Sequence, residues 1–308
     1  MVINVISEES DKSTDNILKW LIYYNQPFQR FNVEQYTPFT YLLGSGNKNR
    51  TKNILHRRAK LRTYLYTGSN ALDNYVKEET NMLIKAWEKI IRSDGRSNYM
   101  GGFNEEDQHD KLFDLFIAES VGLKIPKTLI TNSKKELIDF AEKHKVITKA
   151  IRQPIRLDLE NISISDQGTL LVDEQSIDEL NEDFSLSIFQ EYIEKEFEVR
   201  ALVYEKRIFA MAIFSQMDNS TKTDFRNYNH ETPNRCVPFK LPIGIESKIL
   251  KFFKLKNINM GSIDLIFNEN GFYFLENNPQ GQYEWLSENC NYYVDRYIAE
   301  QLIKFQDE

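Results

Sequence analysis

The sequence predicts an α/β (α+β) fold divided into more than one subdomain, and three observations support this. A short apolar strand, Val2 to Ser7, precedes an amphipathic helix, which is how an α/β unit begins. Helices and strands then alternate through the middle of the chain, and the last third is rich in strands. The 308 residues also exceed what a single hydrophobic core usually organises, so we expect separate domains.

The first domain is predicted to span residues 1–104. Ser13 and Thr14 can cap the helix after the first strand, and apolar residues at helical spacing predict a second helix over 78–93. We interpret the basic run His56-Arg57-Arg58 as solvated surface, in preference to a ligand contact. Three glycines between residues 93 and 104 predict a linker, which marks the domain boundary.

Residues 105–190 are predicted to form a central α+β subdomain, and residues 191–308 a C-terminal subdomain. Asp110 to Val121 reads as a helix, and Ser133 with Glu136 can form a capping box for the next one. The other predicted elements are strands 127–131, 146–150 and 186–192, hairpins 198–203/207–214 and 262–268/272–276, a polar loop 215–235, and helices 244–253 and 294–305.

The composition excludes several classes of protein. A net charge of −7 argues against a general nucleic-acid binder, because such proteins need a broad basic surface. Cys236 and Cys290 are too few for a disulfide framework, so we expect both to be structural, in a reduced, cytoplasmic protein. No segment has the pattern of a signal peptide or the apolar length of a membrane span. We therefore expect no nucleic acid and no membrane as partners.

The second C-terminal hairpin bears two acidic residues that can share a metal ion. Asp264 and Glu276 interrupt two apolar strands, and a three-residue turn over 269–271 places them opposite each other, about 4.5–5.5 Å apart at Cβ. Two carboxylates that close repel unless a cation lies between them. Asn278 points the same way if the strand continues, which completes an oxygen site suited to Mg²⁺. An exposed polar face is the alternative, but it does not explain why the acidic residues oppose one another.

These motifs resemble the ATP-grasp superfamily. Leu275-Glu276-Asn277-Asn278-Pro279 is similar to its metal-binding ending, and Gly261-Ser262-Ile263-Asp264 to its upstream metal aspartate. The resemblance implies an N-terminal pre-ATP-grasp α/β domain, a central α+β subdomain and a C-terminal antiparallel-sheet subdomain, with the nucleotide between the last two. It also implies ATP and Mg²⁺ as cofactors, with Asp264, Glu276 and Asn278 as metal ligands.

The same resemblance implies roles for further residues, which divide into nucleotide-binding and catalytic groups. The nucleotide-binding group comprises two phosphate lysines, Lys111 and Lys149, an adenine hinge of Gln190, Glu191, Tyr192 and Ile193, and Glu198 toward the ribose. The catalytic group comprises Arg200, Arg226 and Arg235 toward phosphate, and Asp224 as an orienting group or base.

Taken without the resemblance, several of these residues fit plainer roles. Lys111 fits a solvated surface lysine, Glu198 with Arg200 fits a salt bridge, and the loop charges fit a solvated loop. Lys149 is a stronger candidate, because it ends an apolar strand where an unpaired ammonium group is costly. The segment after it departs from the superfamily, since residues 150–156 contain no glycine to admit a phosphate close to the backbone. Arg152 or Arg156 can supply positive charge there instead.

Within the superfamily, the chain most resembles the microviridin-type graspetide synthetases, including the grasp-with-spasm branch. The resemblance lies in Asp224-Phe225-Arg226, in Asn234-Arg235 with Val237-Pro238, and in the stretch from Asn278 to Trp285. It implies a ligase that phosphorylates Asp or Glu side chains of a ribosomally made precursor peptide and condenses them with Ser/Thr hydroxyls or Lys amines. It further implies a homodimer and a peptide leader, which we expect to dock near the 198–214 hairpin and the central domain.

Two other functions remain open from the sequence. One is an ATP-grasp ligase that joins a free amino acid or small carboxylate to an amine by the same chemistry. The other is a non-enzymatic binder that kept the fold, which the glycine-free phosphate loop favours.

Overall fold

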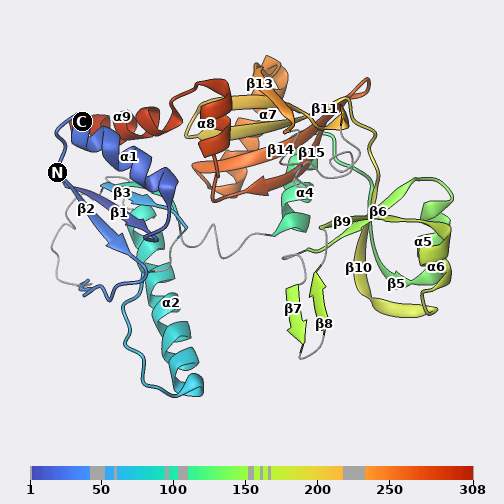
Figure 1. Cartoon of the computed structure of the whole chain (residues 1–308), viewed down its shortest axis with the longest axis horizontal. Coiled ribbons are helices and arrows are strands. Elements are labelled where there is room, and N and C mark those ends of the chain that lie inside the picture. The colour runs from blue at the N-terminus through green and yellow to red at the C-terminus, as the bar shows by residue number, and fades with distance from the viewer. Residues whose placement is uncertain are drawn as a thin grey trace.

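The structure of this chain is a computed structural model with three main sheets and a separate two-stranded hairpin (Figure 1). It describes residues 2–41, 53–58, 61–93, 97–102, 110–151, 156–159, 162–165, 168–217 and 233–307. The chain ends lie close together, because helix α9 (Val294–Asp307) packs beside helix α1 (Lys12–Tyr23) (Figure 1). Within these described residues, no helix is long and apolar enough to cross a membrane.

The N-terminal sheet is parallel, with strand order β2-β1-β3-β4. Its strands are β1 (Ile3–Ser7), β2 (Phe28–Asn32), β3 (Asn53–His56) and β4 (Asn98–Gly101). Strand β4 lies where we predicted a linker, so that prediction is wrong. At Gly101, φ is +70°, and a Cβ there would collide with the His56 carbonyl. The glycine therefore permits a close approach of two strands and does not mark a flexible connection.

Helix α2 (Asn70–Ser93) begins earlier than the predicted helix and extends well beyond the sheet (Figure 1). Trp87 and Ile91, in its C-terminal half, are buried against the sheet, whereas Met82 and Leu83 are exposed. Apolar residues at helical spacing thus correspond to a buried face only in the part of the helix that the sheet reaches.

His56 and Arg57 are both buried, although we predicted a solvated surface for this run. The prediction is wrong because segments distant in sequence enclose these residues. His56 Nδ1 lies 2.8 Å from the Tyr99 hydroxyl, and Arg57 Nε lies 3.3 Å from Asp11 Oδ2. A run of basic residues alone does not reveal such partners.

The central sheet is antiparallel, in the order β5-β10-β6-β9. Its strands are β5 (Thr128–Ser133), β6 (Val146–Lys149), β9 (Thr169–Val172) and β10 (Asp183–Glu191). Helices α5 (Lys134–Ala141) and α6 (Glu174–Asp178) cover one face through Leu137 and Ile177. Ser133 is the N-cap residue of α5, but its side chain makes no capping hydrogen bond, so the predicted capping box is not formed. Within the described part of the chain, strands β7 (Arg156–Leu159) and β8 (Ile162–Ser165) pair only with each other.

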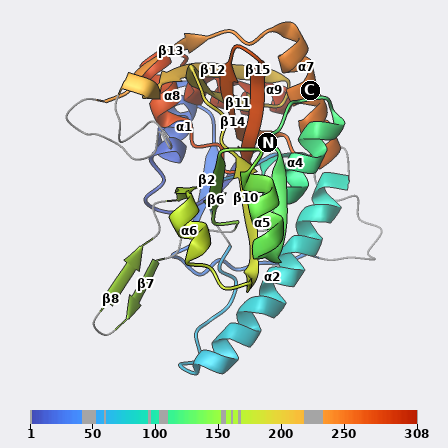
Figure 2. The ribbon, with the colours of Figure 1, turned by 90° about the vertical axis from the view of Figure 1, so that its right-hand side faces the viewer.

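The C-terminal sheet is antiparallel, in the order β13-β12-β11-β14-β15, and the central subdomain lies below it in Figure 2. Its strands are β11 (Phe197–Tyr204), β12 (Arg207–Phe214), β13 (Arg235–Phe239), β14 (Met260–Asn268) and β15 (Gly271–Asn278). Both predicted hairpins are present. The predicted loop 215–235 is wrong at its ends, since residues 215–217 form a 3-10 turn and Arg235 begins β13.

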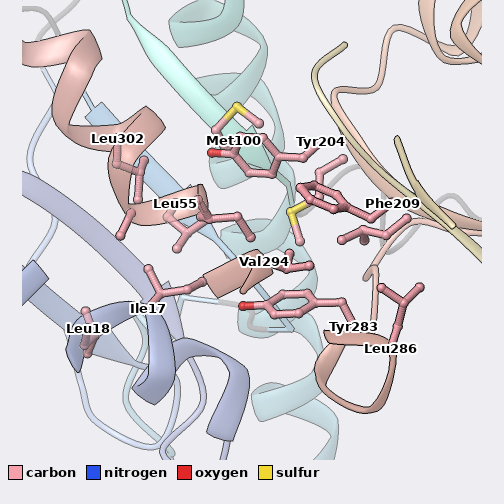
Figure 3. Close-up of a cluster of buried hydrophobic side chains, with 14 of the residues drawn as sticks. Ile17, Leu18, Leu55, Met100, Tyr204, Phe209, Tyr283, Leu286, Val294 and Leu302 are labelled. Atoms are coloured by element: carbon pink, nitrogen blue, oxygen red, sulfur yellow. The ribbon is translucent and has the colours of Figure 1, made fainter. Parts of the chain in front are cut away.

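The two faces of this sheet have different neighbours. Helices α4 (Lys111–Ser120) and α7 (Ile243–Lys256) pack on one face through an apolar core that includes Leu115, Phe252 and Phe274. Part of the other face packs against helix α8 (Glu284–Cys290), helix α9 and the N-terminal domain (Figure 3). The rest of that second face, which bears Glu198, Arg200 and Asp264, is turned toward the central sheet.

Candidate functional site

A cleft between the central and C-terminal sheets brings together residues from both. The central sheet contributes one face of its strands, because Ile147 pairs with Gln190 and Lys149 pairs with Thr169. The opposite face of that sheet is covered by its helices, so only this face is available. The residues that line the cleft include Lys149, Gln190, Glu191, Tyr192, Ile193, Lys195, Glu198, Asp264, Leu275 and Glu276.

Asp264 and Glu276 are cross-strand partners, as the sequence predicted, but the route to this register is different. The hairpin loop has two residues instead of three, since Asn268 pairs with Gly271. That register alone would place Leu275 opposite Asp264. A β-bulge at Leu275 adds one residue to β15 and restores the pairing of Asp264 with Glu276. Both Leu275 and Glu276 consequently line the cleft.

Each of these carboxylates also faces a cation. Arg200 is opposite Asp264 on β11, with its Nε 3.7 Å from Asp264 Oδ1, so the contact is an ion pair without hydrogen-bond geometry. Lys111, the first residue of α4, places its Nζ 3.5 Å from Glu276 Oε2. Arg200, Asp264 and Glu276 thus form one row across three neighbouring strands, and Lys111 closes the row from a helix.

Glu198 is held inside the cleft wall by two donors. Lys195 donates to Glu198 Oε1, and the Ser215 hydroxyl donates to the same oxygen at 2.8 Å. All three side chains are almost completely buried. Lys195 was missed by the sequence analysis. Its only sequence signal is that it stands three residues before Glu198, at the entry to a strand, and many surface pairs share this spacing.

The segment after β10 offers backbone groups to the cleft. The amides of Glu191 and Tyr192 are engaged, since they donate to the carbonyls of Lys127 at 2.9 Å and Lys145 at 2.7 Å. Ile193 is buried and lines the cleft, and its amide has no hydrogen bond to any described residue. The Gln190 side chain, which also lines the cleft, donates to the Thr128 hydroxyl at 2.8 Å and so ties this segment to strand β5.

Not every predicted site residue lies in the cleft. Asn278 pairs with Ser262, and its Oδ1 accepts the Gln280 amide at 3.2 Å, beyond the residues that line the cleft. Arg235 is on edge strand β13, three strands away from β14, where its guanidinium stacks 5.3 Å above the Phe214 ring. Asp224 and Arg226 lie outside the described residues, as does Arg152.

Trp285 is a second residue that the sequence analysis did not single out for the site. The Arg200 guanidinium lies 5.5 Å above its ring, which orients a buried arginine by a cation–π contact. Trp285 is the second residue of α8, and no periodicity in the sequence connects it to β11.

The donor set around Asp264 and Glu276 suits a hard divalent ion that also binds phosphate. Among the described residues, no cluster of three or more His, Cys, Asp or Glu side chains could hold a metal on protein ligands alone. Mg²⁺ differs from ions that need a full protein cage, because it is commonly held by one or two carboxylates plus substrate phosphates and water. Two carboxylates flanked by the cations Arg200 and Lys111 therefore fit Mg²⁺ bound together with a nucleotide.

The fold and the cleft define the class of this protein, an ATP-grasp protein with its nucleotide cleft between two sheets. Residues 108–304 match the RimK-like ATP-grasp domain, and the chain belongs to that family. ATP with Mg²⁺ is the cofactor set of ATP-grasp enzymes. No curated protein matches this chain in sequence.

Solved structures with the same fold include three that are described in complex with a leader, core or precursor peptide. A Chryseobacterium gregarium RiPP-associated ATP-grasp ligase, in complex with ADP and a leader and core peptide, is 23% identical, with a TM-score of 0.83 over 99% of this chain and 97% of that chain. The macrocyclase MdnC from Microcystis aeruginosa MRC, bound with precursor peptide MdnA, is 24% identical, with a TM-score of 0.76 over 98% and 99%. The ATP-grasp ligase PsnB, complexed with a minimal precursor, Mg and ADP, is 16% identical, with a TM-score of 0.72 over 98% and 96%.

Proposed function

We propose that this chain is an ATP-dependent ligase that cyclises a ribosomally made precursor peptide through its Asp or Glu side chains. The observation that supports this most directly is the row of Arg200, Asp264 and Glu276, closed by Lys111, beside a cleft that also contains Lys149. Similar solved structures are described with leader, core or precursor peptides, and they span almost the whole of this chain. The alternative ligase for free amino acids uses the same site but requires no peptide.

In this proposal, adenine binds at residues 191–193, where the Ile193 amide is available as a donor. Glu198 lies two strand positions from Arg200 on the same face, in reach of a ribose. Lys149 and Lys111 balance the charge of phosphate oxygens. Asp264 and Glu276, together with Asn278, would hold Mg²⁺, which supplies further positive charge to the phosphates when bound.

The reaction has two chemical steps. A carboxylate oxygen of the peptide attacks the γ-phosphorus of ATP, the bond from that phosphorus to the ADP oxygen breaks, and an acyl phosphate forms. A Ser/Thr hydroxyl or Lys amine then attacks the acyl carbon, phosphate leaves, and the hydroxyl or amine proton passes to a base. Arg200, Arg226 and Arg235 are the proposed phosphate-binding arginines, and Asp224 the proposed orienting group or base.

We further propose that the protein acts as a homodimer in the cytoplasm. Both of its cysteines are free thiols, as expected in a reducing compartment, and ATP is available there. The leader is proposed to dock near the 198–214 hairpin and the central domain. A leader peptide alone that shows no binding at micromolar concentration would contradict this docking site.

Mass spectrometry of the precursor peptide tests the proposed function. Incubation with the protein, ATP and Mg²⁺ should remove about 18 Da for each ring, because each condensation releases one water overall. ATP turnover that depends on the peptide supports the proposal. Turnover with free amino acids and no peptide supports the small-molecule ligase, and no turnover in either case supports a non-enzymatic binder.

A further inference from the structure

Arg57, which follows β3, is the largest of the fully buried side chains and lies outside the cleft. Its Nε lies 3.3 Å from Asp11 Oδ2, and that oxygen also accepts hydrogen bonds from Thr14 at 2.7 Å and Ser7 at 3.1 Å. The guanidinium lies 5.0 Å from the centre of the Tyr283 ring. One side of Arg57 is therefore anchored firmly in the N-terminal domain.

The other side of Arg57 reaches the C-terminal subdomain. Its Nη1 donates to the carbonyl oxygens of Gln280 at 3.3 Å and Gly281 at 3.4 Å. These two residues form the turn that follows β15. Because a buried backbone carbonyl needs a hydrogen-bond donor, an arginine that serves two of them stabilises the conformation of this turn.

The turn is in direct contact with the proposed metal-binding end of β15. The Gln280 amide donates to Asn278 Oδ1 at 3.2 Å, and the Gly281 amide donates to the Asn278 carbonyl at 3.1 Å. Gly281 has a φ of +55°, and a Cβ there would lie 3.2 Å from Leu202 Cδ1, so the turn is packed against the sheet. A shift of the turn would consequently move Asn278, and Glu276 two residues before it.

We infer that Arg57 is a positioning residue, which holds the 280–281 turn and thereby sets the metal-binding end of β15. This inference rests on the proposed role of Glu276 and Asn278 in holding Mg²⁺. It assigns to the N-terminal domain a part in Mg²⁺ binding, although none of the residues that line the cleft comes from that domain among those the structure describes. Residues that orient metal ligands typically change metal affinity about 10–100-fold when replaced.

The experiment is a Mg²⁺ titration of the binding of a fluorescent ADP analogue to the full-length protein. For Arg57→Met, the half-saturating Mg²⁺ concentration should rise about tenfold or more, while the affinity for the analogue at saturating Mg²⁺ stays near that of the wild type. Arg57→Lys keeps the charge beside Asp11 but lacks the planar fork that serves two carbonyls, so its shift should be smaller. Such partial rescue by lysine is not expected of a residue that only fills space.

Leu21→Ala is the matched control. Leu21 is fully buried in the core that also contains Tyr283, so its truncation destabilises the same region without touching the 280–281 turn. Its half-saturating Mg²⁺ concentration should equal that of the wild type. Equal half-saturating Mg²⁺ concentrations for Arg57→Met and Leu21→Ala would overturn the inference. If Arg57→Met does not fold, Arg57→Lys decides the question. A half-saturating Mg²⁺ concentration equal to that of the wild type overturns the inference, and a raised one supports it.

The same titration separates this inference from the proposed function. A wild-type protein that binds the analogue with Mg²⁺ but forms no rings would refute peptide cyclisation, and a shifted Arg57→Met would still support the positioning role. If the wild type forms rings but the half-saturating Mg²⁺ concentration of Arg57→Met equals that of the wild type, peptide cyclisation is supported and the positioning role is refuted. Analogue binding by the wild type without any dependence on Mg²⁺ would overturn the positioning role.

Discussion

Two buried arginine–aspartate pairs in this protein differ in how completely they are closed. Arg57 Nε lies 3.3 Å from Asp11 Oδ2, and the two side chains are 1% and 2% exposed. Two hydroxyl groups also donate to Asp11 Oδ2. Arg200 Nε lies 3.7 Å from Asp264 Oδ1, the two side chains are 7% and 10% exposed, and Asp264 lines the cleft. A buried charge is costly unless hydrogen bonds compensate it. The Asp11 carboxylate is therefore compensated inside the fold, whereas the Asp264 carboxylate of the looser pair faces the cleft.

Replacement of Asp264 should have the largest effect on activity. Asp264→Asn should reduce peptide-dependent ATP turnover about a hundredfold or more, because it removes one of the two carboxylates proposed to hold Mg²⁺. Its unfolding free energy should stay within about 1 kcal/mol of the wild type or rise, since the substitution also relieves repulsion from Glu276. Turnover assays and urea unfolding of the same variant measure the two effects. Asp183→Asn, on the exposed start of β10, is the control.

Replacement of Asp11 should have the opposite profile. Asp11→Asn should lower the unfolding free energy by about 3 kcal/mol, because Arg57 then remains buried without its counter-charge. The affinity for an ADP analogue at saturating Mg²⁺ should be unchanged. Urea denaturation gives the first quantity and a fluorescence titration the second. A stability loss as small as that of Asp264→Asn would erase the contrast between the two pairs.

The pH dependence of stability should sharpen the same contrast. Burial by itself would raise the pKa of Asp11, but the Arg57 charge and the hydrogen bonds from Thr14 and Ser7 outweigh it and lower the pKa below 3.8. A lowered pKa stabilises the folded state above the pKa of the unfolded chain and ceases to do so as the pH falls through the folded value. The stability difference between wild type and Asp11→Asn should thus be constant above about pH 5 and shrink below about pH 4. Calorimetry of both proteins across this range measures it, and a difference that grows on acidification would contradict the pairing.

The smallest effect is expected at the two thiols. Burial raises the pKa of Cys236 to about 11, and burial together with the neighbouring Cys236 raises that of Cys290 to about 11. Neither is then a thiolate at neutral pH, so iodoacetamide should leave peptide-dependent ATP turnover intact. Rapid inactivation that Cys236→Ala prevents would show that this reading of the thiols is wrong.

Local patterns in the sequence predicted most of the elements near the cleft. Strand β14, strand β15 and the hairpin of β11 and β12 all have alternating or continuous apolar residues that fit a sheet, and each formed where expected. The prediction failed for β4, because the sequence does not show the neighbouring strand that Gly101 accommodates. It failed for Arg57 because Asp11 and Gly281 are far from it in the chain.

The sequence by itself determined that Asp264 and Glu276 stand on adjacent strands, because a hairpin is a local structure with few possible registers. Only the tertiary structure showed how they come to oppose each other, through a two-residue turn and a bulge at Leu275 in place of the three-residue turn predicted from the sequence. Likewise, the sequence contained Arg57, Arg200 and Lys111, but their partners Asp11, Asp264 and Glu276 lie on other elements, far away in the chain. Periodicity reports the face on which a side chain lies, whereas its partners are set by which elements pack together.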